Sequence, residues 1–132
     1  MSLAHVTLAT RDVERTASFF ERTFGFRRRA IPDNSPAETQ WLETGRGQQL
    51  HVVYVEGFAT SPFEGEFGRH VALYAPRLGF SALKQRLVDE GATIVAPLRA
   101  TSFERFFVRE PINGYVLEVI ATADPDFSGS GR

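Results

Sequence analysis

The internal repeat of this sequence limits its possible folds more than any other feature. HVTLA at residues 5–9 matches HVALY at residues 70–74, an offset of 65 residues (70 − 5). GQQLHVV at residues 47–53 matches GYVLEVI at residues 114–120, an offset of 67 residues (114 − 47). Self-similarity at nearly constant spacing along the chain predicts two copies of one structural unit.

The first copy has the pattern of a strand followed by a helix and three more strands. Residues 5–9 alternate as a half-buried strand does, and Asp12 stands where a helix N-cap is expected. Apolar residues at spacings of three and four over residues 13–24 predict the helix, which Gly25 is placed to end in a left-handed conformation. Further strands are expected at residues 27–31, 39–44 and 48–55, with a turn at residues 45–47.

The second copy repeats this order after a segment rich in turn residues. Phe80, Leu83 and Leu87 form the apolar stripe of a helix, and Gly91 is its expected end. Strands are expected at residues 70–74, 93–96, 103–109 and 115–121. The sequence therefore predicts an α+β fold of two tandem βαβββ modules.

The length of 132 residues suits one domain of two small modules that share a core. We predict a single domain over residues 1–121. It consists of module one (4–56), a linker (57–68) and module two (69–121), followed by a flexible Gly/Ser-rich tail (122–132).

Charge and cysteine content exclude several classes of function. The 15 Lys and Arg nearly balance the 16 Asp and Glu, so the chain lacks the basic character that nucleic-acid binding requires. It has no cysteine, so any metal must be held by nitrogen and oxygen ligands. No apolar run approaches ~18 residues and no signal peptide is recognised, so we expect a cytoplasmic protein without a membrane span.

Four residues that can bind a metal occupy equivalent positions of the two copies. His5 matches His70, and His51 matches Glu118; these are the only 3 histidines of the chain. If a pseudo-two-fold axis relates the copies, the four side chains could meet at one point. Imidazole nitrogens and a carboxylate suit divalent iron, cobalt, nickel, copper or zinc. A single histidine is more often an ordinary core or surface residue, but the matched set favours a metal site, with His51 as its least needed ligand.

Glu118 supports the same hypothesis independently. It lies in the apolar segment YVLEVI at residues 115–120, which is expected to be buried. A lone buried carboxylate must be protonated or must have a bound cation or strong hydrogen-bond donors beside it. A metal ion would meet that requirement.

These patterns together resemble the vicinal oxygen chelate superfamily, which includes glyoxalase I, fosfomycin-resistance thiol transferases, extradiol catechol dioxygenases and bleomycin-resistance proteins. The resemblance rests on the βαβββ repeat and on the segments HVTLATRDVERTASFFERTFGF, GRHVALYAP and FFVREPINGYVLEV, and it covers residues 4 to about 121. It implies a curved mixed sheet around a cavity, where a divalent metal ion binds two neighbouring oxygens of a small substrate. It also implies a homodimer with the site at or near the dimer interface.

The resemblance implies roles for individual residues. In glyoxalase I the ligands run His, Glu, His, Glu, and the matching positions here are His5, His51, His70 and Glu118. Glu118 matches the glutamate that is both ligand and general base, whereas His51 replaces the other glutamate. The fosfomycin transferases and the extradiol dioxygenases use a His, His, Glu set that matches His5, His70 and Glu118. Bleomycin-resistance proteins bind drug without metal and lack these ligands.

The expected function is therefore that of a divalent-metal-dependent glyoxalase-like enzyme, a lyase or isomerase, with iron, nickel, cobalt, zinc or manganese. The first alternative is an iron-dependent dioxygenase or a thiol transferase of the same superfamily. The second is a non-catalytic dimer of the bleomycin-resistance type that binds and sequesters a drug.

Three smaller features carry expectations of their own. The turn EPING at residues 110–114 is one residue longer than the Asp-Pro-Asp-Gly turn usual in the family, and we expect a lengthened hairpin without a functional role. Strand alternation sends Arg28 to the face opposite its two neighbouring arginines, which favours a solvated strand. Arg105 shares strand parity with Phe107 and is a candidate to reach the cavity.

Overall fold

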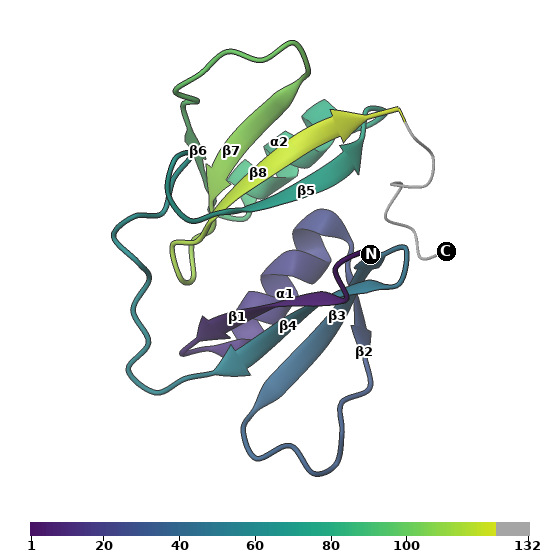
Figure 1. Cartoon of the computed structure of the whole chain (residues 1–132), viewed down its shortest axis with the longest axis vertical. Coiled ribbons are helices and arrows are strands. Elements are labelled where there is room, and N and C mark those ends of the chain that lie inside the picture. Colours follow the sequence, from purple (N-terminus) through teal and green to yellow (C-terminus); the bar gives the residue numbers. More distant parts are fainter. Residues whose placement is uncertain (124–132) are drawn as a thin grey trace. The chain divides into compact units, whose positions relative to one another are not determined.

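The chain passes twice through the order strand, helix and three strands in the computed structural model, which describes residues 1–123 (Figure 1). The first unit, residues 1–59, contains β1 (His5–Thr10), α1 (Val13–Phe24), β2 (Arg27–Arg29), β3 (Thr39–Gly45) and β4 (Gln48–Tyr54). The second unit, from Thr60 onward, contains β5 (Val71–Pro76), α2 (Phe80–Asp89), β6 (Thr93–Val95), β7 (Arg105–Arg109) and β8 (Val116–Thr122). The predicted α+β fold of two βαβββ modules is confirmed.

The first unit is a four-stranded mixed sheet with α1 packed on one face. Its strand order is β1-β4-β3-β2, with β1 parallel to β4 and the other neighbours antiparallel. Because side chains alternate along a strand, Leu42 and Val52 share one face of the sheet, where both are 0% exposed, and α1 contacts both of their strands. The same alternation directs His5 and His51 to the opposite face.

Both ends of α1 have the predicted caps. The Asp12 carboxylate accepts the backbone N–H of Arg15 at 3.0 Å, which satisfies a donor that the first turn of a helix leaves free. Gly25 has a φ of 75°, and its N–H donates to the carbonyl oxygen of Glu21 at 3.1 Å. The local sequence therefore fixes where α1 begins and ends.

The second unit repeats the architecture with strand order β5-β8-β7-β6, in which β5 is parallel to β8. Phe80, Leu83 and Leu87 are buried, as the predicted stripe requires. The helix ends at Asp89, and Gly91, with a φ of 97°, follows two residues later rather than directly. Neither α1 nor α2, the helices of the described chain, is long and apolar enough to cross a membrane.

Several predicted boundaries are wrong by one or two residues. His70 precedes β5, β7 begins at Arg105 rather than at residue 103, and β2 ends at Arg29 rather than at residue 31. The predicted tail begins at residue 122, but Thr122 still belongs to β8, and residues 124–132 lie outside the described part of the chain. A strand ends where its neighbour stops pairing, so its own sequence does not fix the last residue.

Arg28 ties β2 to α1. As predicted, it lies on the face opposite its neighbours, and its guanidinium donates to Glu14 at 2.8 Å and to Glu21 at 2.9 Å. The hydrogen bond between Arg28 and Glu14 raises the pKa of Arg28 and lowers the pKa of Glu14. The expectation of a solvated strand is therefore wrong for Arg28, which joins the sheet to the helix.

The turn between β7 and β8 is organised by a buried carboxylate. Glu110 is 1% exposed, and its side chain accepts the backbone N–H groups of Ile112 at 2.7 Å, Asn113 at 2.9 Å and Tyr115 at 3.2 Å. Gly114 adopts a φ of 89° within the turn, a conformation that other residues adopt at a cost. Glu110 therefore gives the longer turn a structural role.

Candidate metal centre

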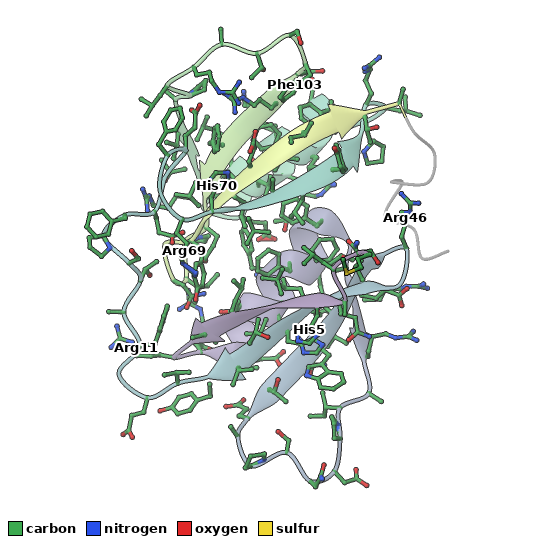
Figure 2. All side chains as sticks on the ribbon, viewed as in Figure 1. His5, Arg11, Arg46, Arg69, His70 and Phe103 are labelled. Atoms are coloured by element: carbon green, nitrogen blue, oxygen red, sulfur yellow. The ribbon has the colours of Figure 1, made fainter. Side chains whose placement is uncertain are left out.

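The face of the first sheet opposite α1 carries a stack of three rings. Trp41 and His51 are cross-strand partners on β3 and β4, and their ring centroids lie 4.1 Å apart at an interplanar angle of 2°. His5 lies on β1 (Figure 2). The centroid of its ring is 3.9 Å from that of His51, at an interplanar angle of 10°. Because β4 runs between β1 and β3, the His51 ring is covered on both faces, and the residue is 7% exposed.

His51 also has a fixed protonation pattern. Its Nε2 lies 2.7 Å from the side-chain oxygen of Gln49, and because an amide oxygen only accepts, Nε2 carries the proton and Nδ1 holds the lone pair. Burial lowers the pKa of His51, and the neighbouring charge of His5 lowers it further. His51 is therefore a neutral imidazole at pH ~7, which is the form that binds a metal.

His70 and Glu118 meet on the second sheet, on the face opposite α2. His70 directly precedes β5, and Glu118 lies in the middle of β8, paired with Ala72 on β5 and with Phe107 on β7. The Nε2 atom of His70 lies 3.2 Å from Oε1 of Glu118. The parallel pairing of β5 with β8 thus brings together two residues that are far apart in the sequence.

The remaining ring nitrogen of His70 identifies its tautomer. Nδ1 lies 2.9 Å from the carbonyl oxygen of Gly65, which only accepts, so Nδ1 carries the proton. In the neutral imidazole, Nε2 then presents a lone pair to a carboxylate oxygen of Glu118. Two acceptors that face each other at 3.2 Å require a shared cation, which is either a proton or a metal ion.

The second oxygen of Glu118 is bound by Arg105. Nη1 of Arg105 donates to Oε2 of Glu118 at 2.9 Å, and the arginine side chain is 4% exposed. The guanidinium carbon lies 4.9 Å from the centroid of the Phe107 ring, as expected from their shared strand parity. The cation that a buried Glu118 requires is therefore already present as a side chain, so burial alone does not demonstrate a metal.

Sequence reasoning missed Glu66, which completes this cluster. Its Oε2 accepts Nη2 of Arg105 at 3.1 Å, and its Oε1 accepts the backbone N–H of Leu98 at 2.6 Å. Burial raises the pKa of Glu66, but the hydrogen bonds from Leu98 and Arg105 lower it by more, so this carboxylate is ionised. Glu66 lies in the segment predicted as a linker, outside the matched parts of the repeat, so the repeat gave no indication that it belongs to the site.

The structure brings the four predicted ligands together as two pairs, one in each unit. His5 and His51 form the first pair through their stacked rings, and His70 and Glu118 form the second through their polar atoms. Within residues 1–123 neither unit gathers three His, Asp or Glu side chains in a group that could hold a metal ion. The complete ligand set therefore stays a prediction.

Comparisons with known proteins address the family and the fold. The family model described as the Glyoxalase/Bleomycin resistance protein/Dioxygenase superfamily matches residues 2–119. No curated protein matches the sequence.

Several solved structures are similar to this chain. A mutant of the genomically encoded fosfomycin resistance protein FosX from Listeria monocytogenes, complexed with Mn(II) and 1S,2S-dihydroxypropylphosphonic acid, has a TM-score of 0.74 at 13% identity over 91% of each chain. FosX from Mesorhizobium loti has a TM-score of 0.69 at 18% identity over 90% of each chain. A putative glyoxalase family protein from Bacillus anthracis has a TM-score of 0.73 at 22% identity, over 92% of this chain and 95% of that one. At such identities these likenesses show a shared fold.

Proposed function

Because the chain belongs to the Glyoxalase/Bleomycin resistance protein/Dioxygenase superfamily, we propose that it is a divalent-metal-dependent enzyme acting on a small molecule. The substrate would bind through two neighbouring oxygens, and lyase or isomerase chemistry is the first choice among the reactions of the family. The observation that carries the proposal is the pair formed by His70 Nε2 and Glu118 Oε1, which face each other at 3.2 Å.

The chemistry of this donor pair fits a metal ion. Protein nitrogen and oxygen ligands lie about 2.0–2.2 Å from a divalent ion such as zinc, so two neighbouring ligands are roughly 2.8–3.6 Å apart, from octahedral to tetrahedral geometry. His70 and Glu118 are already at that separation, 3.2 Å. A ligand histidine usually donates its other N–H to a carbonyl or carboxylate, as His70 does to Gly65.

His5 is the proposed third ligand and His51 the fourth candidate, because the repeat places them at positions equivalent to His70 and Glu118. Nitrogen and oxygen ligands suit iron, nickel, cobalt, zinc or manganese. When bound, the ion would supply Lewis acidity toward the substrate oxygens. His51 would bind the metal ion through Nδ1, the ring nitrogen that holds the lone pair.

Glu118 is the proposed catalytic base as well as a ligand. Its Oε2 is occupied by Arg105, so Oε1 is the oxygen of Glu118 left either to hold the metal ion or to accept a proton from the substrate. The Phe107 ring, which is 1% exposed, lies opposite Glu118 on the neighbouring strand and keeps water from that side. Glu118 is therefore held in one orientation beside an apolar surface.

Metal titration of chelator-treated protein tests the proposal. We expect one or more of the five ions to bind, and His70→Ala to weaken that binding by more than about 100-fold, since loss of an outer partner alone costs 10–100-fold. The exposed Glu56, replaced by Gln, is the control and should bind as the wild type does. Measuring dioxygen uptake with the loaded protein separates an iron-dependent dioxygenase, which consumes it, from a lyase, isomerase or thiol transferase.

Arg105 favours a second candidate function, that of a non-catalytic protein that binds and sequesters a drug. Together with Arg99, which lies 3.6 Å from Glu66, it balances the charges of Glu66 and Glu118 without a metal, so the buried carboxylate is stable in a protein that never binds one. In that case drug binding is unchanged by chelation and by Glu118→Gln. The enzyme proposal requires both treatments to weaken substrate binding.

We also propose that the protein acts as a homodimer in the cytoplasm, as its family resemblance suggests. Light scattering on the purified protein should then give twice the mass of one chain, which is 14.7 kDa. A single-chain mass at the concentrations used for activity assays would contradict the dimer.

A further inference from the structure

We propose that Glu66 is a positioning residue that sets the orientation of Glu118 through Arg105. The inference rests on the proposed function, because it concerns the carboxylate that would bind the metal. Glu66 contacts Arg105, and Arg105 contacts Glu118. Neither the internal repeat nor the family resemblance marks Glu66.

The guanidinium of Arg105 is divided between two carboxylates. Nη1 donates to Glu118 at 2.9 Å, whereas Nη2 donates to Glu66 at 3.1 Å and to the carbonyl oxygen of Arg99 at 2.6 Å. An arginine bound by one carboxylate alone commonly uses two nitrogens on its two oxygens. Because Nη2 is held by Glu66 and Arg99, Arg105 takes only Oε2 of Glu118 and leaves Oε1 facing His70.

The cluster is buried, so water does not replace these contacts easily. The side chains of Arg105, Glu66 and Glu118 are 4%, 6% and 10% exposed. The Phe107 and Phe103 rings lie 4.9 Å and 6.0 Å from the guanidinium carbon and close it off further. When one charged side chain of the cluster is removed, we therefore expect the remaining ones, rather than water, to form new hydrogen bonds with the groups left free.

The segment that carries Glu66 also orients His70. The carbonyl oxygen of Gly65, the preceding residue, accepts Nδ1–H of His70. The segment is itself anchored, because Glu64 accepts the backbone N–H of Val116 at 2.8 Å and Glu66 accepts that of Leu98. Residues 64–66 thus orient both proposed metal ligands of the second unit, His70 directly and Glu118 through Arg105.

Glu66→Gln is the substitution that separates positioning from packing. Glutamine keeps the size of the side chain and an oxygen for the Leu98 N–H, but its NH₂ group cannot accept from Arg105. Nη2 then keeps only its bond to the carbonyl oxygen of Arg99, and Arg105 is expected to turn toward both oxygens of Glu118. Because Arg105 and the metal ion then compete for Oε1, the affinity for the metal should fall by about 10–100-fold.

The experiment is a titration of metal-free protein with Co²⁺, followed by its visible absorption, in the wild type, Glu66→Gln and the exposed control Glu56→Gln. Urea unfolding of the same metal-free proteins measures any loss of stability. We expect the Co²⁺ dissociation constant of Glu66→Gln to rise by at least about 10-fold and that of Glu56→Gln to match the wild type.

Wild-type Co²⁺ affinity in Glu66→Gln, whether or not its stability falls, would overturn the inference and leave the proposed function standing. If the wild-type protein does not bind Co²⁺, the same titration is run with the other four ions, and a protein that binds none of the five would overturn the proposed function and the inference with it. If Glu66→Gln does not fold, Arg105→Lys takes its place, because a single ammonium group cannot hold both carboxylates in the same geometry. It carries the same expected loss of affinity, and unchanged affinity would again overturn the inference.

Discussion

Replacing Glu110 by alanine is expected to lower the free energy of unfolding by about 3 kcal/mol. The carboxylate is 1% exposed and accepts three backbone N–H groups. The Tyr115 N–H is buried, so its bond to a charged acceptor is lost in full, at roughly 2 kcal/mol. The N–H groups of Ile112 and Asn113 are only partly buried, so water can bind them once the carboxylate is removed. Each therefore adds only about 0.5 kcal/mol to the loss of stability.

Urea unfolding followed by far-ultraviolet circular dichroism measures this loss. For a domain of this size it corresponds to a fall in Tm of roughly 10 °C. Glu110→Gln keeps one acceptor oxygen and should lose about half as much stability. The exposed Glu56, replaced by Ala, is the control and should stay within about 0.5 kcal/mol of the wild type. If Glu110→Ala is equally stable, the cost of burying the carboxylate cancels its hydrogen bonds, and the reasoning about the turn is refuted.

Two further predictions concern the first unit. The pKa of Glu14 is lowered by its hydrogen bond from Arg28, so the stabilisation that this pair provides is present at neutral pH and disappears as the pH falls below 4.5, the ordinary value. The stability difference between wild type and Arg28→Met should therefore be largest near neutral pH and shrink as the pH is lowered below 4.5; a difference independent of pH would contradict the assignment. His51→Phe keeps an aromatic ring in the stack and should weaken Co²⁺ binding less than His5→Phe does, because His5, His70 and Glu118 already make a three-ligand set that does not need His51. Equal losses in the two variants would show that His51 is a full ligand.

The sequence predicted the fold well because its main determinants are local or repeated. Asp12 and Gly25 limit α1 through contacts within the helix itself, so a short window of sequence was sufficient. The repeat supplied the rest, since HVTLA and HVALY could be aligned without knowing what either strand pairs with. Gly91 shows the limit of such reasoning, because α2 ended two residues before it.

The candidate site was predicted less completely because its contacts depend on register and on distant segments. The stack of Trp41 on His51 requires the pairing of β3 with β4 to be known to the residue. Glu66 was missed because it reaches Arg105 across a large sequence separation, and nothing in a turn-rich stretch distinguishes it from a solvated glutamate. Arg105 was predicted to share a face with Phe107, but strand parity alone did not show that it binds Glu118.

The metal content of protein purified without any chelator tests the central claim most directly. Elemental analysis should find about one divalent ion per chain in the wild type, and both His70→Ala and Glu118→Gln should lose most of it, since each removes a proposed ligand. Sub-stoichiometric metal in the wild type, unchanged in His70→Ala, would contradict the account and favour the metal-free binding protein.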